Sequence, residues 1–526
     1  MTVLGLDIGT SAVKGLLLDA DGRVTGSARR SYRLDLPEPG RVELPADRVW
    51  YAVAAVTATL AATARDAGSP VRAIAASGSG DEVAMVDGAG VAVGPVIVAL
   101  DGRSRAIGRA LEDRFGVAEL YARTGIALTG LSPLVRLLWL REHEPATAAR
   151  VHRLLAWPEL MTLRLGVEPR SEPSLAGRTL GYSLRADRYD AGLLAALDID
   201  PALLPPVVPS GTPIGTVGSA VAVRLGLDGG VVVVTGGFDQ AMATLGAGAL
   251  DTGTAHVGTG SYEALTAVMD QPVVDAGSQA GGWSVGRSVA GTARWSRMAS
   301  WLGGAAVRWL ATSTAGAWPA GPSPSPAKLL REMPDGPARL LALSGLEGAA
   351  GVLVGLDLGT RRGDMAAAIL EAVTMDLRRA LGDLERVGVT VRTLRATGGG
   401  ARSRRWLQLK ADVTGRVVER VAVREAGAFA AAFLAGAAVG MLPPAEDAAR
   451  HLVRVDVHVE PRRALEAHYQ ERAALHAELR AAFPAELRAA LPIADDPGDS
   501  AGLRARPRTG RRDAPGARHR PAGGCR

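Results

Sequence analysis

Cysteine is nearly absent from this chain of 526 residues, whose one cysteine is Cys525. A single cysteine cannot form a disulfide within the chain, so a disulfide-stapled secreted scaffold is excluded. Aromatic residues make up only 4% of the sequence, whereas it contains 65 glycines. We therefore expect close packing through small side chains and a reducing, cytoplasmic location.

A long, leucine-rich apolar run of the kind that crosses a bilayer is also lacking. Residues 426–445 carry no charge over 20 positions, but they are mainly alanine and glycine and include Pro443 and Pro444. Membrane-spanning helices are richer in leucine, isoleucine, valine and phenylalanine. We expect a buried helix that ends near Gly440, no membrane partner, and no signal peptide in MTVLGLDIGT.

The excess of positive over negative charge belongs to one segment of the chain. Residues 501–526 hold eight arginines and one aspartate, a net charge of +7, while the whole chain carries +6. The remaining residues therefore sum to about −1. The segment lacks interleaved aromatics, so no nucleic-acid partner is expected. Its proline, glycine and arginine content predicts a disordered basic tail over 495–526.

The most informative stretch is 231–261. Four consecutive valines predict a short buried strand, which Gly236 and Gly237 end. Asp239 and Gln240 follow, and a small-residue helix comes after them. An acid after a buried strand, placed close to the glycine-bracketed hydroxyl loop at 258–261, favours the transfer of a phosphoryl group. The alternative is that Asp239 only caps the following helix.

The first residues predict a β-hairpin with a phosphate-binding turn. Asp7 ends a short strand, Thr10 and Ser11 line the turn, and Lys14 lies in the returning strand. Hydroxyls and backbone N–H groups of such a turn can donate to phosphate oxygens. Lysine occurs only three times in the chain, and its compact charge suits phosphate. An ordinary hairpin with a surface lysine is the alternative.

A weaker echo of this hairpin occurs about 250 residues later, in the run HVGTGS. Gly258, Thr259 and Gly260 form its tip, and His256 stands where the first hairpin has Asp7. Two such hairpins predict two domains of like architecture that face each other across a cleft. One acid near the metal and phosphates suffices, because a second would repel the γ-phosphate.

Two other groups of residues indicate ligand contacts. Asp81, Glu82 and the pair Asp101 and Arg103 follow predicted strands. Carboxylates accept hydrogen bonds from sugar hydroxyls and arginine donates to them, although Asp-Gly is also a common turn pair. The triple glycine at 398–400 lies between a predicted strand and a predicted helix, which lets backbone approach phosphates or a flat ligand. A packing turn is the alternative there.

Taken together, these segments resemble the FGGY carbohydrate kinase family, which includes xylulokinase-like, gluconate and glycerol kinases. The matching pieces span roughly residues 2–440 and are, in order, DIGTSAVKGLLLD, PVIVALDGRS, GGFDQAMATLGAGAL, HVGTGS, GVLVGLDLGT, AAAILEAVTMDLR, TGGGARSRRWLQLKADVTGRVVE and EAGAFAAAFLAGAAVG. The resemblance implies an α/β fold of two ribonuclease-H-like domains of the actin/hexokinase type, which close on ATP, Mg²⁺ and a sugar.

The resemblance also implies roles for single residues. Asp239 resembles the catalytic base, and Asp7 resembles the acid at the metal and phosphate position. The residues that match the ATP- and phosphate-binding loops are Thr10, Ser11, Lys14, Gly258, Thr259, Gly260, Gly398, Gly399, Gly400 and Ser403. The residues expected to contact the substrate are Asp81, Glu82, Asp101, Arg103, Asp239 and Gln240.

The expected organisation has four parts. A sugar-binding domain covers 1–247, a nucleotide-binding domain covers 248–445, a helical extension covers 446–494, and the basic tail follows.

Xylulokinases tend to carry a Gln-Met-His-Gly-like segment where this chain has Ser79-Gly80-Asp81-Glu82, and the arginine–glutamate sugar clamp of glycerol kinases is not evident there. The sugar is therefore left open.

We predict a xylulokinase-like enzyme that phosphorylates a small sugar, sugar acid or polyol with ATP, with a homodimer left open. The alternatives are an ATPase of the same fold and a regulator that binds nucleotide or sugar without kinase activity.

Overall fold

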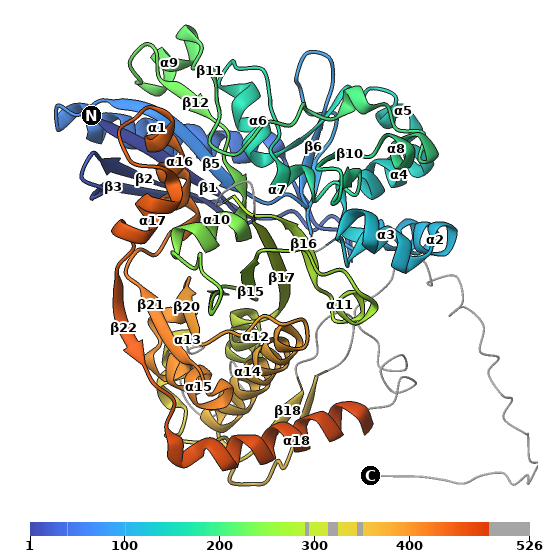
Figure 1. Cartoon of the computed structure of the whole chain (residues 1–526), viewed down its shortest axis with the longest axis vertical. Coiled ribbons are helices and arrows are strands. Elements are labelled where there is room, and N and C mark those ends of the chain that lie inside the picture. Colours follow the sequence, from blue (N-terminus) through green and yellow to red (C-terminus); the bar gives the residue numbers. More distant parts are fainter. Residues whose placement is uncertain (39, 100, 290–293, 314–324, 344–350, 483–526) are drawn as a thin grey trace, which may run out of the picture.

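The computed structural model of the chain describes residues 1–482, except 39, 100, 290–293, 314–324 and 344–350. The predicted basic tail therefore lies outside the described residues. Figure 1 shows the first half of the chain in the upper part of the molecule and most of the second half in the lower part. Within the described residues, no helix is both long and apolar enough to cross a membrane.

One seven-stranded sheet is built from the first half of the chain. Its strands are β1 (Thr2–Ile8), β2 (Ala12–Asp19), β3 (Val24–Ser31), β5 (Val71–Gly78), β11 (Pro213–Thr216), β12 (Val232–Val234) and β13 (Gly237–Phe238). The order is β11, β12, β5, β1, β2 and β3, with β13 also paired to β5. Strand β1 is antiparallel to β2 and parallel to β5, which confirms the predicted first hairpin.

A second seven-stranded sheet is built from the later half. Its strands, in spatial order, are β16 (Ser284–Arg287), β17 (Trp295–Leu302), β15 (Tyr262–Met269), β14 (Thr254–Thr259), β20 (Thr393–Thr397), β21 (Val417–Val421) and β22 (Val455–Val459). Strand β14 is antiparallel to β15 and parallel to β20, as β1 is to β2 and β5. The echo between the two hairpins therefore extends to the strands beside them.

The remaining elements cover and connect these sheets. In the described part of the chain, four two-stranded ribbons are formed by β4 (Glu43–Leu44) with β7 (Val96–Ile97), β6 (Val83–Val86) with β8 (Arg153–Ala156), β9 (Tyr182–Ser183) with β10 (Arg188–Tyr189), and β18 (Leu341–Leu343) with β19 (Val352–Val354). The α-helices before residue 240 are α1 (Ala46–Asp66), α2 (Arg105–Phe115), α3 (Val117–Thr124), α4 (Pro133–His143), α5 (Pro145–Ala148), α6 (Trp157–Arg164), α7 (Pro173–Ala176), α8 (Ala191–Ala196), α9 (Ser219–Leu225) and the start of α10 (Asp239–Gly246). The later ones are α11 (Ala276–Ala280), α12 (Gly304–Ser313), α13 (Pro326–Glu332), α14 (Arg362–Arg386), α15 (Arg404–Thr414), α16 (Ala426–Ala438), α17 (Ala445–Leu452) and α18 (Glu466–Ala482).

Helix α16 is the buried alanine-rich helix predicted within residues 426–445. Although it comes late in the sequence, it packs on β1, β5 and α10, and Figure 1 shows it beside the first sheet. Small residues make this contact possible. A Cβ on Gly5 would lie 1.9 Å from the carbonyl oxygen of Ala428, and one on Gly246 would lie 1.9 Å from that of Ala426.

The expected division between 1–247 and 248–445 separates the two sheets along the chain. Helix α16, which belongs to the second segment by sequence, shares the apolar core of the first sheet, as does α17 at the start of the expected helical extension. The chain therefore crosses back to its first half before β22 and α18 return to the second sheet. The assignment of sugar binding and nucleotide binding to these segments stays a prediction.

Replacing Gly246 by alanine should destabilise the protein by about 1–3 kcal/mol, because the new methyl group would overlap the backbone of α16. Urea unfolding followed by circular dichroism measures the change. The matched control is Gly229→Ala, where nothing lies within 4 Å of the place that the new methyl group would occupy and stability should stay within about 0.5 kcal/mol of wild type. Equal unfolding midpoints for the two variants would show that α10 and α16 are not in this close contact.

Candidate active site

Asp239 begins α10 directly after the short strand β13. The backbone just before it lies against β5, since a Cβ on Gly236 would be 1.6 Å from the carbonyl oxygen of Ala76. The carboxylate is therefore held at the N-terminal, positive end of the helix macrodipole. Its Oδ1 atom is buried and has no hydrogen-bond partner within the described residues.

The pKa of Asp239 is raised to about 7. Burial is the largest cause because it disfavours the charged form, and the negative charges of Asp7, Asp81 and Glu82 add to it. A hydrogen bond from the backbone N–H of Gln240 acts in the opposite direction. A carboxylate with a pKa near 7 is well matched to accepting a proton at neutral pH.

These carboxylates converge because three neighbouring parallel strands end side by side. Asp7 of β1 and Gly237 of β13 both pair with Ser77 of β5, from opposite sides. Asp81 and Glu82 follow soon after the end of β5. The carboxyl ends of parallel strands are a common place for ligand sites. The structure thus brings together four predicted site residues from three separate segments.

Lys14 is the counter-charge to Asp7. Its Nζ lies 3.3 Å from Oδ2 of Asp7 and 2.9 Å from Oε2 of Glu425. Burial lowers the pKa of Lys14, but the two carboxylates outweigh it and the net shift is upward, so the ammonium stays charged. Glu425 precedes α16, and a Cβ on Gly427 would lie 2.9 Å from Oδ1 of Asp7. Glu425 is not among the predicted site residues. Its place just before an apolar helix is the one feature of the sequence that could have indicated it.

The turn of the first hairpin is joined to the segment that follows β5. Thr10 Oγ1 donates to Oε1 of Glu82 at 3.2 Å, and Trp157 Nε1 donates to Oε2 at 2.8 Å. Burial raises the pKa of Glu82, while the hydrogen bond from Trp157 lowers it. Ser11 remains exposed at the turn, where a phosphate could reach it. Trp157 was not among the predicted site residues, because no local spacing singles it out.

Two arginines that the sequence did not indicate hold the Asp81 segment. Arg178 Nε donates to Oδ1 of Asp81 at 2.9 Å. Arg136 is buried and donates to the carbonyl oxygens of Asp81 and, at 2.7 Å, Ile97. Its Nε and Nη2 have no hydrogen-bond partner within the described part of the chain. Burial lowers the pKa of Arg136, although Asp81 and Glu82 act against this.

Asp101 and Arg103 contact each other. Asp101 Oδ2 accepts from the backbone N–H of Val42 at 2.7 Å, and Arg103 Nε donates to Oδ1 at 2.9 Å. Arg103 Nη2 also donates to Glu43 at 2.7 Å. The guanidinium lies over the ring of Trp139, 5.1 Å from its centroid. Both oxygens of Asp101 are thus engaged in fastening the segment after β7 to β4, and substrate binding by this pair stays a prediction.

The second hairpin meets the triple glycine. Thr259 Oγ1 donates to the carbonyl oxygen of Thr397 at 2.5 Å and accepts from the backbone N–H of Ala401 at 2.7 Å. Gly398 has a φ of +87°, and a Cβ there would lie 3.0 Å from the carbonyl oxygen of Thr259. The predicted residues 258–260 and 398–400 are therefore brought together at one edge of the second sheet.

His256 occupies the place that Asp7 has in the first hairpin. Its Nε2 lies 2.7 Å from Thr397 Oγ1, and burial lowers its pKa to about 4, so the ring is neutral at pH 7. The second hairpin also reaches α10, since a Cβ on Gly258 would lie 3.8 Å from Oε1 of Gln240. The two halves of the predicted site are therefore adjacent.

A cavity of about 890 Å³ opens beside the second hairpin, between α12, α13 and α15. The predicted residues that line it are Thr259, Gly260, Gly399, Gly400 and Ser403. It is also lined by five arginines, and among its described lining residues none is acidic; the arginines are Arg308, Arg331, Arg402, Arg404 and Arg405. A Cβ on Gly400 would lie 2.2 Å from the ring of Trp406, another lining residue. A basic cavity with glycine backbone and an aromatic wall suits a nucleotide.

Two like sheets, each with a glycine–hydroxyl hairpin, and a buried carboxylate beside them are features of a two-lobed phosphotransferase. The N-terminal domain of the FGGY family of carbohydrate kinases matches residues 2–246, and the C-terminal domain of the same family matches residues 327–439. The chain belongs to the FGGY family of carbohydrate kinases. It is a sugar or polyol kinase, as the sequence predicted.

Relatives with two different names match most of the chain. A glycerol kinase of Aromatoleum aromaticum is 31% identical over 479 residues, which cover 85% of this chain and 92% of the relative. A xylulose kinase of Staphylococcus xylosus is 23% identical and covers 82% of this chain and 90% of its own length. The family is thus established, whereas the predicted xylulokinase-like specificity is not.

Solved structures confirm the predicted fold class. A ligand-bound xylulose kinase from Lactobacillus acidophilus aligns with a TM-score of 0.83 at 22% identity, over 92% of this chain and 99% of that one. A Plasmodium falciparum glycerol kinase with ADP aligns with a TM-score of 0.80 at 16% identity, over 92% of this chain and 98% of that one. At these identities the likeness concerns the fold alone.

Asp239→Asn should stabilise the folded protein at pH 8 by about 1–2 kcal/mol, because the raised pKa shows that the folded state disfavours the charged carboxylate. The gain should be fully present above pH 7 and vanish below about pH 4, where the carboxyl is protonated in both states. Urea unfolding at pH 8 and pH 4 measures it.

The matched control is Asp190→Asn, which should act in the opposite direction. Burial raises the pKa of Asp190, but hydrogen bonds from the N–H of Leu193 and from Arg123 outweigh it, and the net shift is downward. Neutralising Asp190 should therefore cost stability at pH 8. If both variants lose stability alike, Asp239 is not electrostatically unfavourable in the folded protein.

Proposed function

We propose that the enzyme transfers the γ-phosphoryl group of ATP to a hydroxyl of a small sugar, sugar acid or polyol, with Asp239 as the general base. The observation that supports this most directly is the placement of Asp239. Its Oδ1 atom is buried without a partner among the described residues, its carboxylate lies near Asp7 of the first hairpin, and its pKa is raised to about 7. Such a group can take the proton of an attacking hydroxyl without an intermediary.

The phosphate chain is proposed to lie between the two hairpins. Thr10, Ser11 and Lys14 would meet it from one side, and Gly258, Thr259 and Gly260 from the other. Backbone N–H groups and a charged lysine supply stabilisation where negative charge develops during transfer. The nucleoside would then occupy the basic cavity, against Gly400 and Trp406.

Asp7 is suited to a magnesium ion bound together with the phosphates. Within the described residues no three acidic, histidine or cysteine side chains form a closed metal site. Mg²⁺ bound with a nucleotide needs only one or two carboxylates, because phosphate oxygens and water fill the other positions. Asp7 would supply a carboxylate, with Asp239 close by. When bound, the ion neutralises charge on the phosphates.

The acceptor is proposed to lie against the segment after β5. Asp81 and Glu82 are held there by Arg178, Arg136, Trp157 and Thr10 and follow the strand that pairs with β13. The relatives named glycerol kinase and xylulose kinase support a polyol or a ketose as the acceptor class.

Asp239→Asn should lower kcat by about 10²–10⁴-fold, because the amide cannot accept the hydroxyl proton. ATP affinity should change by less than about threefold, since the side chain is not placed against the nucleoside cavity. Coupled ADP release with a panel of sugars, sugar acids and polyols measures turnover, and calorimetry measures ATP binding. Asp198→Asn, at a fully exposed aspartate, is the control.

Full turnover in the Asp239 variant would disprove the base assignment. ADP release that is independent of every acceptor would instead support the ATPase alternative, and nucleotide binding without turnover would support a regulator.

The pH dependence of kcat/KM should follow the titration of the Asp239 carboxylate. Because the base must be deprotonated, kcat/KM should fall about tenfold per pH unit below pH 7 and level off above it. Measurements between pH 5 and pH 9 with the preferred acceptor test this. A profile that stays flat down to pH 5 would mean that no group with a pKa near 7 accepts the proton.

A further inference from the structure

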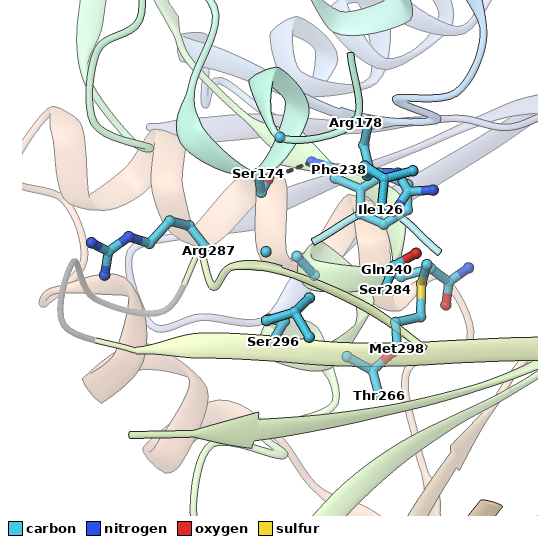
Figure 2. Close-up of a pocket in the computed structure, with 14 residues that line it drawn as sticks. Ile126, Ser174, Arg178, Phe238, Gln240, Thr266, Ser284, Arg287, Ser296 and Met298 are labelled. Atoms are coloured by element: carbon cyan, nitrogen blue, oxygen red, sulfur yellow. Dashed lines mark hydrogen bonds between the residues drawn. The ribbon is translucent and has the colours of Figure 1, made fainter. Parts of the chain in front are cut away.

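A small cavity of about 30 Å³ lies between the two halves of the chain, beside the start of α10. Figure 2 shows its lining residues coming from several elements around it. Ser174, Arg178, Phe238 and Gln240 come from the first half, and Thr266, Ser284, Ser296 and Met298 come from β15, β16 and β17 of the second sheet.

Three polar atoms of residues that line this cavity are buried without a hydrogen-bond partner within the described residues. They are Oε1 of Gln240, Oγ1 of Thr266 and Oγ of Ser296. Thr266 is fully buried and Ser296 is 8% exposed. Buried polar groups nearly always have a partner, because an unpaired one costs about 1–3 kcal/mol. Three such atoms on residues around one cavity suit an occupant that carries a hydroxyl.

The cavity is large enough for part of an acceptor. One water needs roughly 10–15 Å³ of such a cavity, so about 30 Å³ admits about two non-hydrogen atoms, such as those of a CH₂OH group. Ile126, Phe238 and Met298 supply apolar surface for the carbon. Gln240 Oε1 can accept the proton of the hydroxyl, and the hydroxyls of Thr266 and Ser296 can donate to its oxygen.

The cavity adjoins the proposed acceptor site through two residues. Gln240 follows Asp239 in the chain, and successive helix residues point about 100° apart. A molecule that offers one hydroxyl to Asp239 and a second to Gln240 would therefore extend around the start of α10. Arg178, which also lines the cavity, is the arginine that pairs with the carboxylate of Asp81.

We propose that this cavity binds the hydroxymethyl end of the acceptor that is remote from the reacting hydroxyl, and that Thr266 and Ser296 thereby select linear polyols and ketoses longer than glycerol. The inference rests on the proposed kinase function and narrows its acceptor class.

The test compares wild type with Thr266→Val, Ser296→Ala and the double variant. Each change removes a hydroxyl and nearly preserves shape. The acceptors are glycerol and a panel of pentitols and ketopentoses, assayed by ADP release. For the five-carbon acceptor with the highest wild-type kcat/KM, KM should rise about fivefold per hydroxyl removed, as expected for one hydrogen bond. The value of kcat should stay within about twofold of wild type, and KM for glycerol should not change.

Thr57→Val is the matched control, because Thr57 in α1 is also a fully buried threonine whose hydroxyl has no partner within the described residues. It should leave KM unchanged for every acceptor. Thermal unfolding of all variants, measured without ligand, shows whether a KM change reflects folding.

Calorimetric binding of the same pentitols to wild type and variants separates the two proposals, because it requires no turnover. Weaker binding of pentitols only in the cavity variants supports the cavity proposal even if no acceptor is phosphorylated. Equal KM increases for glycerol and five-carbon acceptors, or none for either, would overturn it and leave water as the occupant. Failure of every compound longer than glycerol to bind wild type would also overturn it, whether or not glycerol is phosphorylated.

Discussion

Desolvation of the Asp239 carboxylate is the constraint on which the proposed site depends. Asp7, Asp81 and Glu82 stand close enough to make its charged form more unfavourable still. The start of α10 offsets part of this cost through the helix dipole and the backbone N–H of Gln240. In water the same carboxyl would be fully ionised at neutral pH and a much weaker base. The burial that lowers stability is therefore what matches the group to proton transfer.

This burial is maintained by contacts between backbones, which only small residues permit. Gly236 places the chain against β5, and Gly246 places α10 against α16. Gly427 brings the start of α16 to Asp7, so that Glu425 and Asp7 share Lys14. A helix from the late part of the chain is thus packed into the first sheet. The high glycine and alanine content serves this arrangement, since larger side chains would separate the elements that carry the charges.

The two hairpins have the same topology and different electrostatics. The first carries Asp7 with Lys14, while the second carries His256, which burial keeps neutral and which contacts Thr397. A second carboxylate at that place would repel a phosphate group. The neutral imidazole of His256 instead forms a hydrogen bond with Thr397 and adds no negative charge. Positive charge in the second half comes instead from the arginines around the larger cavity. The asymmetry suits a nucleotide whose phosphates approach one acidic and one neutral edge.

Local signals in the sequence were enough to predict both hairpins and the alanine-rich helix, and they singled out Asp239 as the candidate base. Valine runs, glycine turns and periodic alanines act between near neighbours, so they can be interpreted without a fold. Residue type also led to Asp101 and Arg103, whose charged groups the structure shows in contact with each other. The type of a side chain does not reveal which hydrogen bonds and ion pairs it already makes within the folded protein.

What the sequence by itself determined is the set of segments and the chemistry available on each of them. Only the tertiary structure decided that α16 lies against β1, that Glu425 meets Lys14, and that arginines 55 and 97 positions away hold Asp81. The physical reason is that burial and long-range charge depend on packing between distant segments. The same reason explains why the raised pKa of Asp239 and the unpartnered hydroxyls of the small cavity appear only in the folded chain.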